Sequence, residues 1–189
     1  ARQDVELALL QGAEAVLRGE KPYRDFTWLY GPAMLYYYGF FMKVLGADIA
    51  GVLFGKFLLD LLCGVVIYLS LIKFIPPLMA MGGCAWFWLY SKGFFYTYNH
   101  AGGTLLISII LYLVFTYILD PRKKTIYLGL AACFLLSLVK LNIGMFNLFG
   151  FMVSIILVDK FLADKPIKDE LSFYAGSFAI TFGLIAASY

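Results

Sequence analysis

Long apolar runs separated by short polar segments fill most of the chain after residue 47. A helix needs about 20 apolar residues to cross a bilayer. The runs predict about six transmembrane spans within residues 48–189, the one at 78–90 being short for a full crossing. They lie at 49–72, 78–90, 104–119, 126–139, 143–158 and 171–189. The expected fold class is therefore all-α, a polytopic transmembrane helical bundle.

The first 47 residues follow a different pattern. On a helical wheel, most apolar residues of 4–18 share one arc, and Asp4, Gln11 and Arg18 lie on the opposite one. This helix is too short and too polar to cross a bilayer, but it is amphipathic enough to lie on its surface. Gly19 is its expected C-cap. Residues 33–45, apolar and aromatic but only about 13 long, predict a second interfacial helix.

Composition and charge support a membrane location. Hydrophobic residues make up 62% and charged residues 14% of the chain, well outside the range of soluble domains. Because basic loops remain cytoplasmic, the loops at 120–124 and 159–170 are expected inside. Residues 1–47, an aromatic loop at 91–103 and the turn at 140–142 then lie outside. The net charge of +3 resides in loops and predicts no nucleic-acid partner.

The sequence contains no motif for nucleotide, zinc or serine-hydrolase chemistry. Its three cysteines, Cys63, Cys84 and Cys133, stand singly in apolar runs and predict small buried side chains. No cofactor is therefore expected, no metal ligands are assigned, and a divalent metal has no support in the sequence.

Two acidic residues of the first 47 are candidates for catalysis. A partly desolvated carboxylate near the membrane surface can act as general base and accept a proton from a hydroxyl group. Asp4 and Asp25 are therefore the predicted catalytic residues. The alternatives are that Asp4 caps the amphipathic helix and that Asp25 forms a salt bridge with Arg24 or Lys21.

Several residues on the predicted outer side are candidates for substrate binding. Arg24, His100 and Lys140 are cationic or can become so, and cations neutralise the charge that develops on a departing phosphoryl oxygen. Tyr23, Trp28 and Tyr30 can stack on a sugar, and Asn142 lies in the same turn as Lys140. The alternatives are that His100 is an interfacial belt residue and that Lys140 and Asn142 anchor helix ends.

The span at 49–72 holds two further features. Gly51 and Gly55 form a Gly-x-x-x-Gly pair, which permits close helix contact. Lys56 and Asp60, four residues apart, face the same way and are expected to pair. They suit a packing role or the binding site of a transporter or lipid flippase. Many transporters contain internal repeats, and none is found here. A membrane scaffold is a third alternative.

Four segments resemble the first outer loop and a later span of GT-C membrane glycosyltransferases, the polyprenyl-phosphate-sugar-dependent, protein-mannosyltransferase-like enzymes of bacteria. The segments are Ala13-Glu-Ala-Val-Leu-Arg-Gly-Glu-Lys-Pro-Tyr-Arg-Asp-Phe26, Tyr30-Gly-Pro-Ala-Met-Leu-Tyr-Tyr-Tyr38, Phe41-Met-Lys-Val-Leu-Gly46 and Lys140-Leu-Asn-Ile-Gly144.

This resemblance implies an enzyme that inverts the sugar configuration. It would transfer a sugar from a polyprenyl-phosphate donor to a hydroxyl-bearing lipid, glycan or protein acceptor, on the periplasmic side of a bacterial inner membrane. Asp4 would be the base. The family often has adjacent Asp and Glu residues at this place, whereas in this chain Val5 separates Asp4 from Glu6, and Glu6 would contact substrate. Residues 1–47 would form the first outer loop of a longer protein, with membrane lipids as its other partners.

Overall fold

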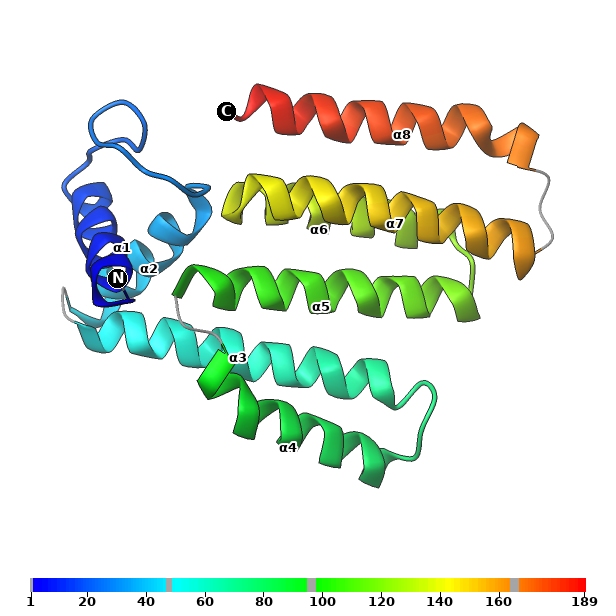
Figure 1. Ribbon diagram of the computed structural model, residues 1–189, viewed down its shortest axis with the longest axis horizontal. Helices are drawn as coiled ribbons and strands as arrows, with labels where there is room; N and C mark the ends of the chain where they lie inside the picture. The colour runs from blue at the N-terminus through cyan, green and yellow to red at the C-terminus, as the bar shows by residue number, and fades with distance from the viewer. Residues whose placement is uncertain (1, 47–48, 95–97, 164–166) are drawn as a thin grey trace. The chain divides into compact units, whose positions relative to one another are not determined.

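The computed structural model describes the backbone of residues 2–46, 49–94, 98–163 and 167–189 and the side chains of 7–46, 49–90, 100–163 and 170–189. Within these ranges the chain forms eight α-helices, and its one extended pairing is an isolated bridge between Pro22 and Phe26 (Figure 1). The helices form two compact units, residues 1–105 and 106–189. The predicted all-α membrane bundle is confirmed.

Helix α1 (Arg2–Leu17) of the first unit is the predicted amphipathic helix. It ends where expected, because Gly19 adopts a φ of +89° that residues with a side chain rarely adopt. The Gly19 N–H donates to the Val16 carbonyl and the Glu20 N–H to the Ala15 carbonyl, each at 3.0 Å. This Schellman motif satisfies the last carbonyl groups and turns the chain out of the helix.

Helix α2 (Ala33–Leu45) has the bounds predicted from its apolar run and packs closely on α3 (Ile49–Leu71). A Cβ on Gly51 would lie 3.0 Å from the Phe41 carbonyl oxygen, so any larger residue would force the two backbones slightly apart. The Tyr37 hydroxyl donates to the Gly55 carbonyl at 2.8 Å, and burial raises the pKa of Tyr37 to about 12, which keeps it a donor. The close contact predicted for the glycine pair is confirmed.

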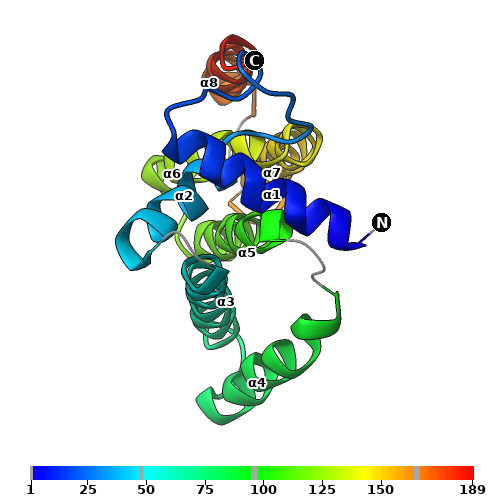
Figure 2. The same ribbon diagram turned by 90° about the vertical axis from the view of Figure 1, so that its left-hand side faces the viewer.

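The arrangement of the first unit supports an interfacial position for its first two helices. Figure 2 looks along α3 and shows α1 and α2 lying across its axis. Helix α4 (Pro77–Phe94) returns alongside α3 after a turn at Pro76. If α3 crosses a bilayer, α1 and α2 lie roughly in the plane of its surface.

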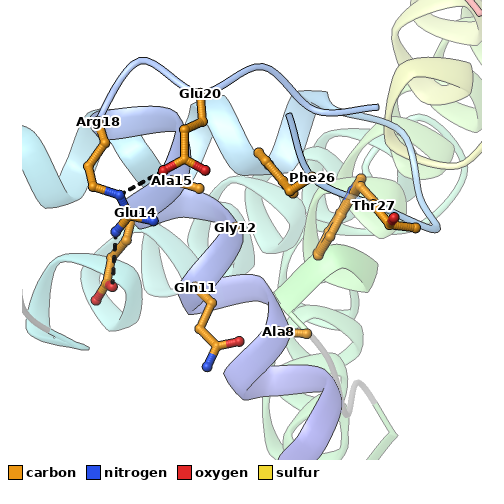
Figure 3. A pocket seen from close by; sticks show the side chains of 10 residues that line it. Ala8, Gln11, Gly12, Glu14, Ala15, Arg18, Glu20, Phe26 and Thr27 are labelled. Carbon is orange, nitrogen blue, oxygen red and sulfur yellow. Dashed lines mark hydrogen bonds and ion pairs between the residues drawn. The ribbon is translucent and has the colours of Figure 1, made fainter. Parts of the chain in front are cut away.

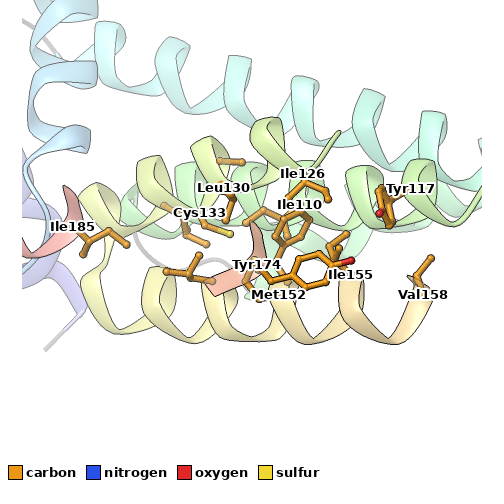
Figure 4. Packing of buried hydrophobic residues seen from close by; sticks show 14 residues of the cluster. Ile110, Tyr117, Ile126, Leu130, Cys133, Met152, Ile155, Val158, Tyr174 and Ile185 are labelled. Atoms are coloured by element: carbon orange, nitrogen blue, oxygen red, sulfur yellow. The ribbon is translucent and has the colours of Figure 1, made fainter. Parts of the chain in front are cut away.

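The second unit consists of the later part of α5 (Tyr98–Leu119) with α6 (Lys123–Val139), α7 (Leu141–Phe161) and α8 (Ile167–Ala187). Lys140 alone separates α6 from α7, which confirms the predicted tight hairpin. The two helices touch backbone to backbone, because a Cβ on Gly144 would lie 2.3 Å from Cα of Ser137. Figure 4 shows their apolar side chains interdigitating with those of α5 and α8.

Among the residues that the structure describes, four helices are long and apolar enough to cross a membrane, which indicates an integral membrane protein. They cover Ile49–Leu71, His100–Leu119, Leu141–Phe161 and Glu170–Ala187. The other two predicted spans correspond to α4, with 18 residues, and α6, with 17. These lengths are near the lower limit for a crossing, so the total of six stays a prediction.

Two segments expected to be loops are helical instead. The predicted aromatic loop at 91–103 is largely absorbed by α4, which extends to Phe94, and by α5, which begins at Tyr98. The predicted charged loop at 159–170 begins later than expected, because α7 continues through Asp159 to Phe161. The hydroxyls of Tyr117 and Tyr174 donate to the Asp159 carboxylate. Asp159, an acidic residue that suggested a loop, therefore lies inside the helix bundle.

Candidate functional site

A polar cleft of about 480 Å³ lies between α1 and the segment that follows it. We call it the α1 cleft. Figure 3 shows Gln11, Glu14 and Arg18 projecting from α1 on one side and Glu20, Phe26 and Thr27 from the following segment on the other. The lining residues are Ala8, Gln11, Gly12, Glu14, Ala15, Arg18, Glu20, Phe26, Thr27 and Trp28.

The sequence of α1 explains why a cleft forms here. Gln11, Glu14 and Arg18 recur at intervals of three and four residues and therefore share one face of the helix. Beside them on the helix surface lie the small residues Ala8 and Ala15, whose short side chains leave space above the helix. The polar arc predicted from the helical wheel is thus the wall of the cleft.

Arg18 holds two carboxylates at the rim of the cleft. Its Nε lies 2.9 Å from Oε1 of Glu20, and its Nη1 lies 4.0 Å from Oε2 of Glu14. The side chains of Glu14 and Arg18 are at least half exposed, so these pairs contribute little to stability. They place both carboxylates at the rim of the cleft, beside the guanidinium.

Trp28 is the aromatic side chain most firmly placed in the wall. Its indole N–H donates to the Gly31 carbonyl at 3.2 Å, and its ring meets that of Tyr30 edge to face. The ring also lies against α1, since a Cβ on Gly12 would be 3.5 Å from one of its carbons. A half-buried ring held from two sides gives the cleft a rigid apolar surface.

The segment from Lys21 to Tyr30 is closed by its own hydrogen bonds. The Lys21 N–H donates to Oδ2 of Asp25 at 2.8 Å, and the Tyr23 N–H donates to the Phe26 carbonyl at 3.0 Å. Tyr23 has a φ of +68°, unusual for a residue with a side chain, and its hydroxyl donates to the Tyr30 carbonyl. Tyr23 therefore has a structural role in the loop beside its predicted role in substrate binding.

Asp25 is bound on both oxygens by its neighbours. Arg24 donates from Nε to Oδ1 and from Nη2 to Oδ2, both at 2.8 Å. The hydrogen bonds from Arg24 and from the Lys21 backbone lower the pKa of Asp25 to about 2, and Asp25 raises the pKa of Arg24. A carboxylate this acidic is a weak base, so the geometry favours a role for Asp25 in loop structure.

The other predicted site residues fall in different parts of the chain. Asp4 and Glu6 lie in α1, but their side chains are outside the described residues. His100 is in the first turn of α5, where its carbonyl accepts the Thr104 hydroxyl at 2.8 Å. These three belong to the first unit.

Lys140 and Asn142 belong to the second unit. Lys140 is extended between α6 and α7, and its N–H donates to the Leu136 carbonyl at 2.9 Å. Asn142 is exposed, and its side-chain oxygen accepts the Ile143 N–H. Their convergence with the first 47 residues on one substrate stays a prediction.

The alternative pair on α3 forms as expected. Nζ of Lys56 lies 2.6 Å from Oδ2 of Asp60, and both side chains are about three-quarters buried. Each group thus has a partner within its own helix, which suits a packing role.

The sequence did not predict a buried cluster in the second unit, in which two tyrosine hydroxyls bind one carboxylate. Asp159 on α7 is only 2% exposed, and it accepts hydrogen bonds from the hydroxyls of Tyr117 on α5 and Tyr174 on α8. The Tyr117 oxygen lies 2.9 and 2.8 Å from its two carboxylate oxygens. A usable signal did exist: all three residues fall near the same predicted face of the membrane, at the end of two spans and the start of a third.

Across the side chains that the structure describes, no group of three or more His, Cys, Asp or Glu is arranged to hold a metal ion. Comparisons with family models, curated proteins and solved structures give no match for this chain. The function is therefore inferred from the residues and their geometry.

Proposed function

We propose that this protein is a membrane glycosyltransferase. It transfers a sugar from a polyprenyl-phosphate donor to a hydroxyl-bearing acceptor, with inversion, on the periplasmic side of a bacterial inner membrane. Asp4 is the general base, and Arg24, His100 and Lys140 bind the donor phosphate.

The α1 cleft is the observation that supports this proposal most. A helix lying across a transmembrane span presents polar groups and a fixed aromatic ring beside a cavity large enough for a sugar. Asp4 precedes Gln11 by seven residues, which is two helical turns, so helix register puts both positions on one face of α1. A base at position 4 would thus lie along the face that lines the cleft.

Asp4 is a better candidate base than Asp25. The hydrogen bonds that lower the pKa of Asp25 to about 2 make its carboxylate a poor proton acceptor. Glu6 stays a candidate for substrate contact, and so do Tyr23 and Asn142.

The direct test is sugar transfer by the full-length protein in membranes, from a radiolabelled polyprenyl-phosphate sugar to endogenous acceptors. Asp4→Asn should reduce transfer at least 100-fold, the lower range for general-base catalysis. Asp25→Asn should retain most of it, because the loop can keep its backbone bonds. Normal transfer by Asp4→Asn would refute the assignment of the base.

Transport is the second candidate, supported by the largely buried Lys56–Asp60 pair in a span. The same assay separates the two functions. Lys56→Ala and Asp60→Ala should leave transfer within about threefold of wild type if the pair only packs. Loss of lipid or solute translocation in these variants, with no transfer by the wild type, would establish the transporter instead.

The proposed sidedness has its own test in sealed inside-out and right-side-out vesicles. Single cysteines replace Thr27, Asn142 or Asp120 in a protein lacking Cys63, Cys84 and Cys133. An impermeant maleimide should label positions 27 and 142 from the periplasmic side and position 120 from the cytoplasmic side. Labelling of 27 and 142 from opposite sides would contradict a shared active site.

A further inference from the structure

The α1 cleft has a charge and a composition that select among the substrates of the proposed reaction. Its lining holds two carboxylates, Glu14 and Glu20, against one guanidinium, Arg18, which leaves one net negative charge. A phosphate entering the cleft would meet this charge and find its one guanidinium already paired with both carboxylates. The donor phosphate is therefore a poor occupant.

The remaining groups suit a neutral ligand rich in hydroxyls. Carboxylate oxygens accept hydrogen bonds from hydroxyls, while the Gln11 amide and the Thr27 hydroxyl can both donate and accept. Gln11, Glu14 and Thr27 are exposed and line the cleft, so a ligand can reach them and replace their bound water with its own hydroxyl groups. A sugar ring has polar edges and less polar faces, and the Trp28 ring supplies the apolar surface for such a face.

Hydrogen bonds also hold the wall of the cleft in place before any ligand binds. Trp28 donates to the Gly31 carbonyl, and the segment from Lys21 to Tyr30 is closed by the hydrogen bonds of Tyr23 and Asp25. Preorganised groups lose less side-chain freedom on binding. Such preparation is unnecessary for a surface that only contacts water.

From these observations we infer that the α1 cleft is a saccharide-binding subsite, which takes the uncharged glycan of the acceptor and excludes the donor phosphate. The identification of the bound glycan as the acceptor rests on the proposed function. The saccharide specificity itself depends only on the cleft. Of the residues expected from sequence to stack on a sugar, Trp28 lines the cleft, which adds Gln11, Glu14 and Thr27 to the site.

The test is saturation-transfer NMR on the full-length protein in nanodiscs without any donor. The probes are methyl α-D-mannopyranoside, methyl β-D-glucopyranoside and methyl N-acetyl-β-D-glucosaminide. At least one should receive saturation. Gln11→Leu and Thr27→Val, which keep side-chain size, should each weaken that signal at least fivefold, and Ala8→Phe, which fills the cleft, should abolish it.

Lys21→Gln is the matched control, because it alters a charged residue of the same segment outside the lining and should leave the signal unchanged. Inorganic phosphate at equal concentration should not displace the saccharide. The inference is overturned if no probe receives saturation, if Gln11→Leu and Thr27→Val both bind as wild type, or if phosphate competes. Because no donor is present, saccharide binding without transferase activity would refute only the proposed reaction, and transfer with an empty cleft would refute only the subsite.

Discussion

The α1 cleft and the α5–α8 bundle differ in how far their polar groups are exposed and in what those groups bind. In the cleft, Glu14 and Arg18 stay at least half exposed and paired at the surface. In the bundle, Asp159 is almost fully buried and bonded to two tyrosines from other helices. Buried polar groups are costly to leave unsatisfied, whereas exposed pairs contribute little to stability. The bundle polar groups therefore serve stability, and those of the cleft are available for binding.

The largest effect is expected at Asp159. Asp159→Ala leaves two buried tyrosine hydroxyls without their acceptor, each at a cost of about 1–3 kcal/mol, so the free energy of unfolding should fall by roughly 2–5 kcal/mol. The measurement is SDS titration in mixed micelles. Asp120→Ala removes an exposed carboxylate paired with Arg122 and should cost less than about 1 kcal/mol.

A triple variant sharpens this result. Replacing Tyr117 and Tyr174 by Phe together with Asp159→Leu removes donors and acceptor at once, so most of the loss should disappear. A triple variant as unstable as Asp159→Ala would show that the loss came from something other than unsatisfied hydroxyls.

The second effect is steric. Gly144→Ala places a Cβ 2.3 Å from the Ser137 backbone and should lower the free energy of unfolding by about 1–3 kcal/mol as α6 and α7 separate. Gly150→Ala is the control in the same helix, since its Cβ meets nothing within 4 Å. It should be neutral or stabilising by up to about 1 kcal/mol. Equal effects from the two substitutions would argue against close backbone contact.

A smaller effect is expected from the loop beside the cleft. Tyr23→Phe removes the hydroxyl that donates to the Tyr30 carbonyl. Hydrogen exchange of amides in residues 21–30 should accelerate severalfold, while global stability changes by less than about 1 kcal/mol. Unchanged exchange in that segment would show that other bonds alone keep the loop closed.

The smallest effect is a pH dependence of the same loop. The pKa of Asp25 is lowered to about 2 in the folded loop, below its unfolded value of about 3.9. A lowered folded pKa means that the stabilisation is fully present above about pH 4 and is lost as the pH falls through about 2. Exchange in residues 21–30 should therefore rise over that range in wild type and less in Asp25→Asn. The same rise in both would rule out Asp25 as its source.

The sequence predicted the helices better than it predicted how polar groups are used. Apolar runs set the bounds of α2, and Gly19 and the Gly51–Gly55 pair identified a helix end and a close contact, because these depend on local backbone requirements. Asp159 was misassigned to a loop, since its burial depends on tyrosines 15 and 42 residues away.

The cleft was predicted only in part, for a similar reason. The polar face of α1 follows from helical periodicity, but its opposite wall depends on how residues 20–28 fold back over it. That path is set by the bonds of Tyr23, Asp25 and Trp28. For Asp25, the structure shows the salt bridge with Arg24 that the sequence offered as the alternative to a catalytic role, and the sequence alone did not decide between the two.

Sugar transfer by Ala8→Phe, measured beside its thermal stability, tests most directly the claim that the α1 cleft serves function. Ala8 is exposed in the cleft, so a phenyl ring there fills the binding space without entering a packed core. The expected result is a loss of transfer of at least tenfold at an unchanged unfolding temperature. Wild-type transfer by this stably folded variant would contradict the claim.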